Sequence, residues 1–172
     1  VERVSGVDVG IKWVNDVWVR KKKICGILTE GSVSMEDGHL EYAIVGIGIN
    51  VYEPVGGFPE EIKEVAGAVF PNDVSRENLR NRIASGVLAQ FLEYYHKLPE
   101  RVYLEEYRKR SVVIGRQVKI IQPEGAKPPE MVRGASREHG LAVGIDDQCH
   151  LLVRYDDGTT ESLSNGEISI KL

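Results

Sequence analysis

The sequence predicts an α+β protein in which a mixed sheet with covering helices is followed by a small β-barrel. Runs rich in β-branched residues, typical of strands, occupy the chain up to about residue 52, and an amphipathic helical repeat follows them. After Ser111, apolar residues alternate with polar ones. We therefore place a domain boundary near residue 112, which divides the chain into residues 1–111 and 112–172.

Four strands are expected in the first segment, between Val7 and Tyr52. Turns are expected at the basic run Arg20–Lys23 and at Glu36–Gly38. The apolar run from Ala43 to Ile49 is unbroken, which is typical of a strand covered on both faces. The expected strands are Gly10–Trp13, Val17–Val19, Lys23–Glu30 and Tyr42–Asn50.

Three helices are expected in the middle of the chain. A short one begins at Pro59-Glu60-Glu61, because proline and acidic residues favour the first helical turn. A longer one begins near Ser75, an N-cap candidate, and ends before Pro99, and a third spans Val102–Arg110. The long helix is expected to cover the core with an apolar face that repeats every four residues: Leu79, Ile83, Val87, Phe91 and Tyr95.

Five short strands are expected after residue 112, and this density of strands predicts a small β-barrel. Asp156-Asp157-Gly158 is typical of a hairpin turn. The proline-rich stretch Gln122–Glu130 is interpreted as an exposed loop of the barrel. The expected strands are Val118–Ile121, Val132–Ala135, Leu141–Ile145, His150–Tyr155 and Glu167–Leu172.

Charge and hydropathy argue against several classes of protein. The formal net charge of -4 provides no overall attraction to nucleic acid or anionic lipid. The longest apolar stretch, Tyr42–Val51, is shorter than the roughly 20 residues that span a bilayer, and no signal peptide opens the chain. Cys25 and Cys149 form no Cys-x-x-Cys pair, which argues against a disulfide framework or a zinc ribbon. We expect a soluble protein of the reducing cytoplasm.

Three motifs in the first segment combine lysines, polar side chains and glycines. They are Lys12-Trp13-Val14-Asn15-Asp16, Lys23-Ile24-Cys25-Gly26-Ile27-Leu28-Thr29-Glu30 and Gly46-Ile47-Gly48-Ile49-Asn50. Fixed lysines and a carboxylate-held Mg²⁺ would stabilise the charge that develops on a phosphate under attack, so the residues point to an anionic ligand or a nucleotide. A structural interpretation is also open, in which Asn-Asp is a turn, the lysines are solvated and the glycines allow tight packing.

The three motifs, in this order and at this spacing, resemble those of the bacterial biotin protein ligases. That family carries Lys-Trp-Pro-Asn-Asp, then Lys-x-x-Gly-Ile-Leu-x-Glu, then Gly-x-Gly-x-Asn. The segments Gly140–Val153 and Asn165–Ile170 resemble its SH3-like C-terminal domain. The resemblance implies that residues 1–111 are the C-terminal half of a biotin/lipoate ligase-like catalytic domain and that residues 112–172 form the SH3-like domain.

The resemblance also implies a reaction and its site. Such a ligase uses ATP, Mg²⁺ and biotin to form biotinyl-5'-AMP, and then transfers biotin to a lysine of the biotin carboxyl carrier protein domain of a carboxylase. It assigns catalytic roles to Lys23, Lys12 and Asp16, with Asp16 also beside Mg²⁺. It places Lys23, Gly26 and Leu28 at biotin, and Asn15, Asn50 and Phe58 at the nucleotide.

The sequence departs from the family pattern in two ways. Val14 stands where the family usually has proline, which changes backbone stiffness and removes no functional group. The Gly-Arg-Gly-Arg-x-Gly-Arg loop that folds over the adenylate does not occur in the 172 residues, and the Ser/Thr-Asn motif that grips the biotin ring does not occur before Lys12. Both normally precede the Lys-Trp motif, so we expect the natural protein to extend upstream of Val1 and the isolated chain to have little ligase activity.

The resemblance also bears on the expected partners, and two other functions stay open. A homodimer through the catalytic sheet is a family expectation, no membrane partner is expected, and DNA binding is expected only with an upstream helix-turn-helix. Two other functions stay open: a lipoate-ligase-like acyltransferase, which shares the fold, and a non-catalytic binding or regulatory module. Cys25 and Trp13 are expected to fill the core, and the four histidines show no metal-ligand spacing.

Overall fold

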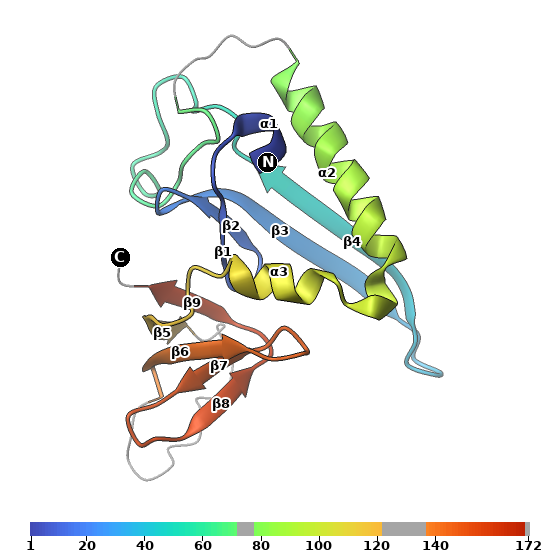
Figure 1. Cartoon of the computed structure of the whole chain (residues 1–172), viewed down its shortest axis with the longest axis vertical. Helices are drawn as coiled ribbons and strands as arrows, with labels where there is room; N and C mark the ends of the chain where they lie inside the picture. The colour runs from blue at the N-terminus through green and yellow to red at the C-terminus, as the bar shows by residue number, and fades with distance from the viewer. Residues whose placement is uncertain (72–77, 122–136, 171–172) are drawn as a thin grey trace. The chain divides into compact units, whose positions relative to one another are not determined.

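The computed structural model describes residues 1–71, 78–121 and 137–170 (Figure 1). The chain divides into two compact units. The first comprises Val1–Val9 and Asn15–Leu88, and the second comprises Gly10–Val14 and Ala89–Leu172. The first motif of the sequence therefore contributes residues to both units.

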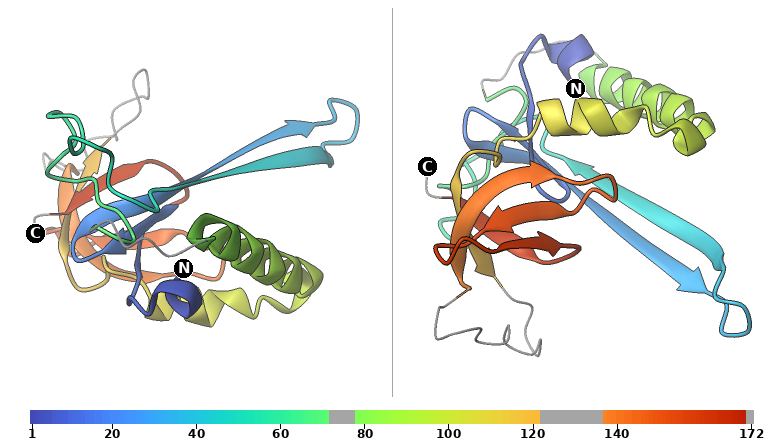
Figure 2. Two further views of the ribbon diagram at one scale, coloured as in Figure 1. Left: turned by 90° about the horizontal axis from the view of Figure 1, so that it is seen from above. Right: turned by 60° about the horizontal axis from the view of Figure 1, so that its bottom comes forward.

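An antiparallel sheet is the framework of the first unit. Three strands of this sheet belong to the first unit: β2 (Asp16–Val19), β3 (Lys22–Val33) and β4 (Leu40–Ile49), in the order β2-β3-β4. β3 and β4 pair along nearly their whole length and form a long ribbon (Figure 2). The three strands expected in this stretch are confirmed, and β3 extends further than expected.

One hydrophobic cluster forms the core of the first unit. Ile24 and Cys25, on β3, are 0% and 4% exposed. Leu79 and Ile83 belong to the same cluster and lie in the first turns of α2 (Leu79–His96). The expected long helix is therefore confirmed as a cover for the sheet over these turns. A four-residue helix, α1 (Glu2–Ser5), precedes the sheet and has no predicted counterpart.

The second half of α2 differs from the prediction. Phe91 and Tyr95 are predicted to cover the core, but they are 43% and 57% exposed. The reason is that the cluster beneath the helix extends no further along it than Val87, among the described residues. The predicted N-cap, Ser75, lies outside the described residues.

The helix predicted at Pro59 is absent from the described structure, which has hydrogen-bonded turns there instead. Lys63 and Ala66 each donate a backbone hydrogen bond to the carbonyl four residues earlier, but no run of such bonds follows. The chain then turns back to β3, where Lys23 N–H donates to the Val65 carbonyl at 2.7 Å and Gly67 N–H donates to the Lys23 carbonyl at 2.8 Å. This pairing ends the helical turns after residue 66.

The exposure of β4 also corrects a prediction. The run 43–49 is predicted to be covered on both faces, but Ile44 is 60% exposed and Ile47 is 37% exposed. Among the described residues, the hydrophobic cluster reaches β4 only at Ile49. An unbroken apolar run thus identifies a strand here without showing that both of its faces are covered.

A five-stranded antiparallel sheet, in the order β8-β7-β6-β5-β9, is the framework of the second unit. Four of its strands match predicted ones, and the predicted hairpin turn at Asp156–Gly158 is confirmed. The turn leads into β8, which has no predicted counterpart because its sequence Thr-Glu-Ser-Leu has a single apolar residue. The predicted strand Val132–Ala135 and loop Gln122–Glu130 lie outside the described residues. The strands are β5 (Gln117–Ile121), β6 (His139–Ile145), β7 (Leu151–Arg154), β8 (Thr160–Leu163) and β9 (Glu167–Ile170).

Three further elements belong to the second unit: β1 (Gly10–Lys12), η1 (Leu98–Glu100) and α3 (Tyr103–Lys109). Trp13 and Tyr107 pack in or against the core cluster of the five-stranded sheet. The contacts therefore separate the chain inside α2, earlier than residue 112, and the division at 112 into two family domains stays a prediction. Within the described ranges, no helix is long and apolar enough to cross a membrane.

The one-sided core of the first unit gives a stability prediction. Ile24→Ala should lower the free energy of unfolding by about 2 to 5 kcal/mol, because it removes a fully buried side chain and leaves a cavity. Ile44→Ala is the matched control: the substitution is the same, but the side chain is 60% exposed, and we expect a loss of about 1 kcal/mol or less. Urea unfolding followed by circular dichroism measures both, and equal losses would contradict the assignment of the core.

Candidate functional site

The central contact of the candidate site joins Lys23 and Asp16. The Lys23 Nζ lies 2.6 Å from Asp16 Oδ1, and the two side chains are 45% and 15% exposed. Asp16 begins β2 and is paired with Gly26 of β3, so both charges are presented by hydrogen-bonded strands. The structure thus brings together three residues that the sequence placed at the site: Lys23, Asp16 and Gly26.

A β-bulge explains how Lys23 and Gly26 come to lie side by side. In a regular strand, residues three apart point to opposite faces of the sheet. Here the register with β2 moves from Val17↔Cys25 to Trp18↔Lys23, so that Ile24 is an extra residue in β3. A bulge re-aims side chains in this way. Ile24 and Cys25 can therefore both be buried, while Lys23 and Gly26 share the other face.

Gly26 lies directly beneath the lysine amine. A Cβ atom added at Gly26 would lie 3.2 Å from Lys23 Cε and 3.3 Å from its Nζ. Beside it, Gly26 pairs with Gly48, and Leu28 pairs with Gly46. Leu28 is 62% exposed. The sheet therefore offers an open floor next to the amine, nearly free of side chains apart from Leu28.

Asn15 is fixed to β3 through both its backbone and its side chain. The Ile27 N–H donates to the Asn15 carbonyl at 3.1 Å, and the Asn15 Nδ2 donates to the Ile27 carbonyl. The Asn15 Nδ2 thus helps to fix the chain to β3. The side-chain oxygen Oδ1 is the group with acceptor capacity for a ligand.

Asn50 connects the end of β4 to the returning segment 67–69. Its Nδ2 donates to the Gly67 carbonyl at 3.0 Å, and its own backbone carbonyl accepts a hydrogen bond from Val69 N–H at 2.9 Å. Gly67 also lines a cavity of about 430 Å³ whose wall includes Phe58. Gly67 therefore accepts a hydrogen bond from Asn50 and shares a cavity with Phe58. Asn50 itself does not line this cavity.

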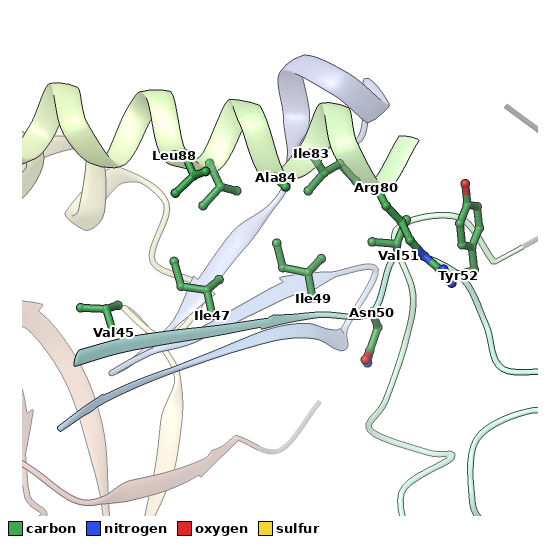
Figure 3. A pocket seen from close by; sticks show the side chains of 11 residues that line it. Val45, Ile47, Ile49, Asn50, Val51, Tyr52, Arg80, Ile83, Ala84 and Leu88 are labelled. Carbon is green, nitrogen blue, oxygen red and sulfur yellow. The ribbon is translucent and has the colours of Figure 1, made fainter. Parts of the chain in front are cut away.

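A second cavity, of about 630 Å³, lies between β4 and α2. Figure 3 shows Val45, Ile47 and Ile49 pointing up toward the helix, whereas Asn50, at the rim, points away from it. At the same end, the Arg80 guanidinium carbon lies 5.4 Å from the centre of the Tyr52 ring. This cavity is on the core side of the sheet, opposite the floor that carries Gly26.

Lys12 is also predicted for the site, whereas Trp13 and Cys25 are predicted for the core. Lys12, at the end of β1 in the second unit, is 8% exposed. Trp13 is 3% exposed, and its Nε1 donates to the Cys149 carbonyl at 2.9 Å. Cys25 is 4% exposed, and burial raises the pKa of its thiol. The predictions that Trp13 and Cys25 fill the core are confirmed, and Lys12 is more buried than a solvated lysine.

The residues at Asp16 fit a magnesium ion only in part. Within the described ranges, no three His, Cys, Asp or Glu side chains are grouped to hold a metal ion. Mg²⁺ at phosphate sites commonly takes one or two carboxylates together with phosphate oxygens and water. Asp16 can supply one such carboxylate, and its ion pair with Lys23 would then have to rearrange.

Two family models match the chain. The Biotin/lipoate A/B protein ligase family matches residues 2–50, and the Biotin protein ligase C terminal domain matches residues 132–171. The biotin--[acetyl-CoA-carboxylase] ligase of Mycobacterium tuberculosis is 31% identical over 169 residues, covering 96% of this chain and 54% of the relative. The bifunctional ligase/repressor BirA of Bacillus spizizenii is 29% identical over 165 residues, covering 92% and 45%. The chain spans about half the length of these relatives.

Solved structures match the chain over nearly its whole length. The apo structure of biotin protein ligase from Aquifex aeolicus has a TM-score of 0.69 and 26% identity, with 99% of this chain and 68% of that chain covered. The same protein in complex with biotin and ATP has a TM-score of 0.68 and 26% identity, with 99% and 65% covered. The similarity therefore extends to the fold as well as to the motifs.

The position of Gly26 beneath the lysine gives a prediction about geometry. Gly26→Ala should displace the Lys23 amine from Asp16 by several tenths of an ångström while changing stability little, because the half-exposed lysine side chain can move. Gly48→Ala, directly across the ribbon, is the control, since its added Cβ meets only the Gly26 carbonyl at 3.9 Å. Crystal structures of the two variants test this, and an unmoved amine in Gly26→Ala would show that the floor has more space than the geometry indicates.

Proposed function

The chain belongs to the biotin protein ligase family, and we propose that it is the C-terminal part of an enzyme that attaches biotin to a carrier protein. The observation that carries the proposal is the Lys23 amine, held by Asp16 above the open floor of Gly26. A cation above a strip of backbone suits an anionic group on a flat ligand. Biotin has such a carboxylate, and the Aquifex aeolicus ligase was solved with biotin and ATP.

The proposed reaction has two steps. In the first, a carboxylate oxygen of biotin attacks the α-phosphorus of ATP and the bond to the β,γ-phosphates breaks. Pyrophosphate is the leaving group, and biotinyl-5'-AMP is the product. In the second, a carrier lysine amine attacks the acyl carbon, an amide forms and AMP leaves. Negative charge grows on the phosphoryl oxygens in the first step, where a fixed cation is most effective. Lys23 is proposed for this role, with the buried Lys12 as the second cation.

The ion pair between Lys23 and Asp16 indicates how the site responds to substrate. The Asp16 carboxylate lies 2.6 Å from the Lys23 amine. Because the lysine side chain is half exposed, its amine can turn to the carboxylate of biotin or to the α-phosphate at small cost. Asp16 would then be one protein carboxylate that could turn to Mg²⁺, together with phosphate oxygens and water.

The nucleotide is proposed to lie between Asn50 and Phe58. The Asn50 Nδ2 already donates to the Gly67 carbonyl, so the group available to adenine is the Oδ1 acceptor, which matches the adenine amino group. Gly67 lines the same cavity as Phe58, whose ring can stack on the base. Asn15 is proposed to contact the nucleotide in the same way, through its Oδ1, because its Nδ2 donates to Ile27.

The proposed acceptor is the biotin carboxyl carrier domain of a carboxylase, the enzyme named in the description of the mycobacterial relative. Of the rivals, the lipoate acyltransferase shares the first family model, but the second model describes the biotin ligase C-terminal domain. This second match favours biotin. Repression is part of the name of the Bacillus relative, and dimerisation and DNA binding by the present protein stay predictions.

Replacing the site lysine should slow adenylate formation. Lys23→Gln, in the full-length enzyme, should lower biotin-dependent ATP–pyrophosphate exchange roughly tenfold or more, since a charged hydrogen bond contributes about 1.5 to 3 kcal/mol. Lys97→Gln is the matched control, because Lys97 is also half exposed and paired with a carboxylate, that of Glu93 at 3.3 Å. Unchanged exchange in Lys23→Gln, or an equal loss in both variants, would reject the assignment.

Replacing the cavity aromatic tests the adenine site. Phe58→Ala should weaken ATP binding by about 1 to 3 kcal/mol and lower the melting temperature only slightly, as expected for loss of base stacking. The alternative, in which Phe58 stabilises the hydrogen-bonded turns that follow it, requires a loss of melting temperature at unchanged affinity. Calorimetric titration with ATP and thermal unfolding of the same variant distinguish the two results.

A further inference from the structure

Tyr107 contacts the backbone of the first motif. Its hydroxyl donates a hydrogen bond to the Val14 carbonyl oxygen at 2.7 Å. That carbonyl belongs to the peptide group that joins Val14 to Asn15. The segment Asn15–Asp16, which the proposed reaction places beside the nucleotide, therefore begins one bond beyond this contact.

The phenol is held in place by its own helix. The Tyr107 ring packs against the core cluster of the second unit. On the next residue, the Arg108 Nε donates to the Ile145 carbonyl at 2.8 Å. Further along, the Arg110 carbonyl accepts a hydrogen bond from Ile11 N–H at 2.7 Å. Because these contacts fix the end of α3, the Tyr107 hydroxyl reaches Val14 from a rigid support.

Trp13 anchors the same stretch one residue earlier. Its Nε1 donates to the Cys149 carbonyl at 2.9 Å, and its ring is 3% exposed. The Val14 side chain, by contrast, is among the exposed hydrophobics at 41%, so it adds little restraint. The backbone that leads into Asn15 is thus held by a buried ring on one side of Val14 and by a phenol hydroxyl at its carbonyl.

Protonation keeps this contact in place. Burial raises the pKa of the Tyr107 phenol, so the hydroxyl remains a donor at neutral pH. A tyrosine-to-phenylalanine change therefore removes one hydrogen bond and leaves the packed ring unchanged.

We propose that Tyr107 is a positioning residue of the ligase, whose hydroxyl fixes the Val14–Asn15 peptide and through it the nucleotide-side residues Asn15 and Asp16. The expected effect of Tyr107 on nucleotide binding rests on the proposed function. The contact itself rests on the geometry of α3 and the motif.

The test compares two tyrosine hydroxyls of the second unit in the full-length enzyme. Tyr107→Phe should raise the KM for MgATP by about two- to tenfold and leave the KM for biotin unchanged, because a neutral hydrogen bond is lost on the nucleotide side. Hydrogen–deuterium exchange should become faster in the peptide that contains Asn15 and Asp16. Tyr155→Phe is the control, since the Tyr155 hydroxyl donates to Glu161 Oε2 at 3.0 Å within the sheet. It should leave both readouts at their wild-type values.

The outcomes separate the inference from the proposed function. An unchanged exchange rate at residues 15–16 in Tyr107→Phe would overturn the positioning role, whatever the kinetics show. Faster hydrogen–deuterium exchange at residues 15–16 with an unchanged KM for MgATP would overturn the expected effect of Tyr107 on nucleotide binding. A loss of activity shared with Tyr155→Phe would also overturn it, because it would report a general loss of stability. A wild-type enzyme with no biotin-dependent exchange of pyrophosphate would refute the proposed function, and the hydrogen exchange alone would then decide the role of Tyr107.

Discussion

The extra residue in β3 is the constraint on which the candidate site depends. With Ile24 inserted opposite the Val17–Trp18 step, the strand buries Ile24 and Cys25 in succession and turns Lys23 to the face of Gly26. A regular strand would send Lys23 and Gly26 to opposite faces. The amine would then lie away from both the glycine floor and Asp16. The spacing of the lysine and the glycine in the motif is therefore meaningful only in combination with the bulge.

Because of the same bulge, the residues that stabilise β3 and the residues proposed for the site lie on opposite faces of the sheet. The core cluster of Ile24, Cys25, Leu79 and Ile83 lies on one side, and the open floor lies on the other. A floor of backbone and glycine gives a ligand close access, but it contributes little apolar burial of its own. The free energy that fixes β3 therefore comes from the opposite face. The charged pair Lys23–Asp16, whose lysine is half exposed, adds little to this free energy and can rearrange.

The sequence predicts the elements whose periodicity is strong and local, and it fails where tertiary pairing decides. Most strands and the helix α2 follow from apolar patterns. The turns at 59–66 do not, because the chain there is recruited to pair with Lys23 instead of continuing as a helix. The bulge is equally hidden, since two successive buried residues are also compatible with a helix or with a strand buried on both faces. The hydrogen bond from Asn50 to Gly67 joins residues 17 apart and carries no local signal.

The first motif shows why residue types alone do not define a site. Four of its five residues fall into two groups with different partners. Trp13 and the Val14 carbonyl bind Cys149 and Tyr107, whereas Asn15 and Asp16 bind Ile27 and Lys23. The division between the compact units falls between these groups, at the Val14–Asn15 peptide. The Asn15 side chain, which has a proposed chemical role, is thus placed by Ile27, which has none. A domain boundary drawn at residue 112 places the whole motif and Tyr107 on one side and Cys149, the partner of Trp13, on the other.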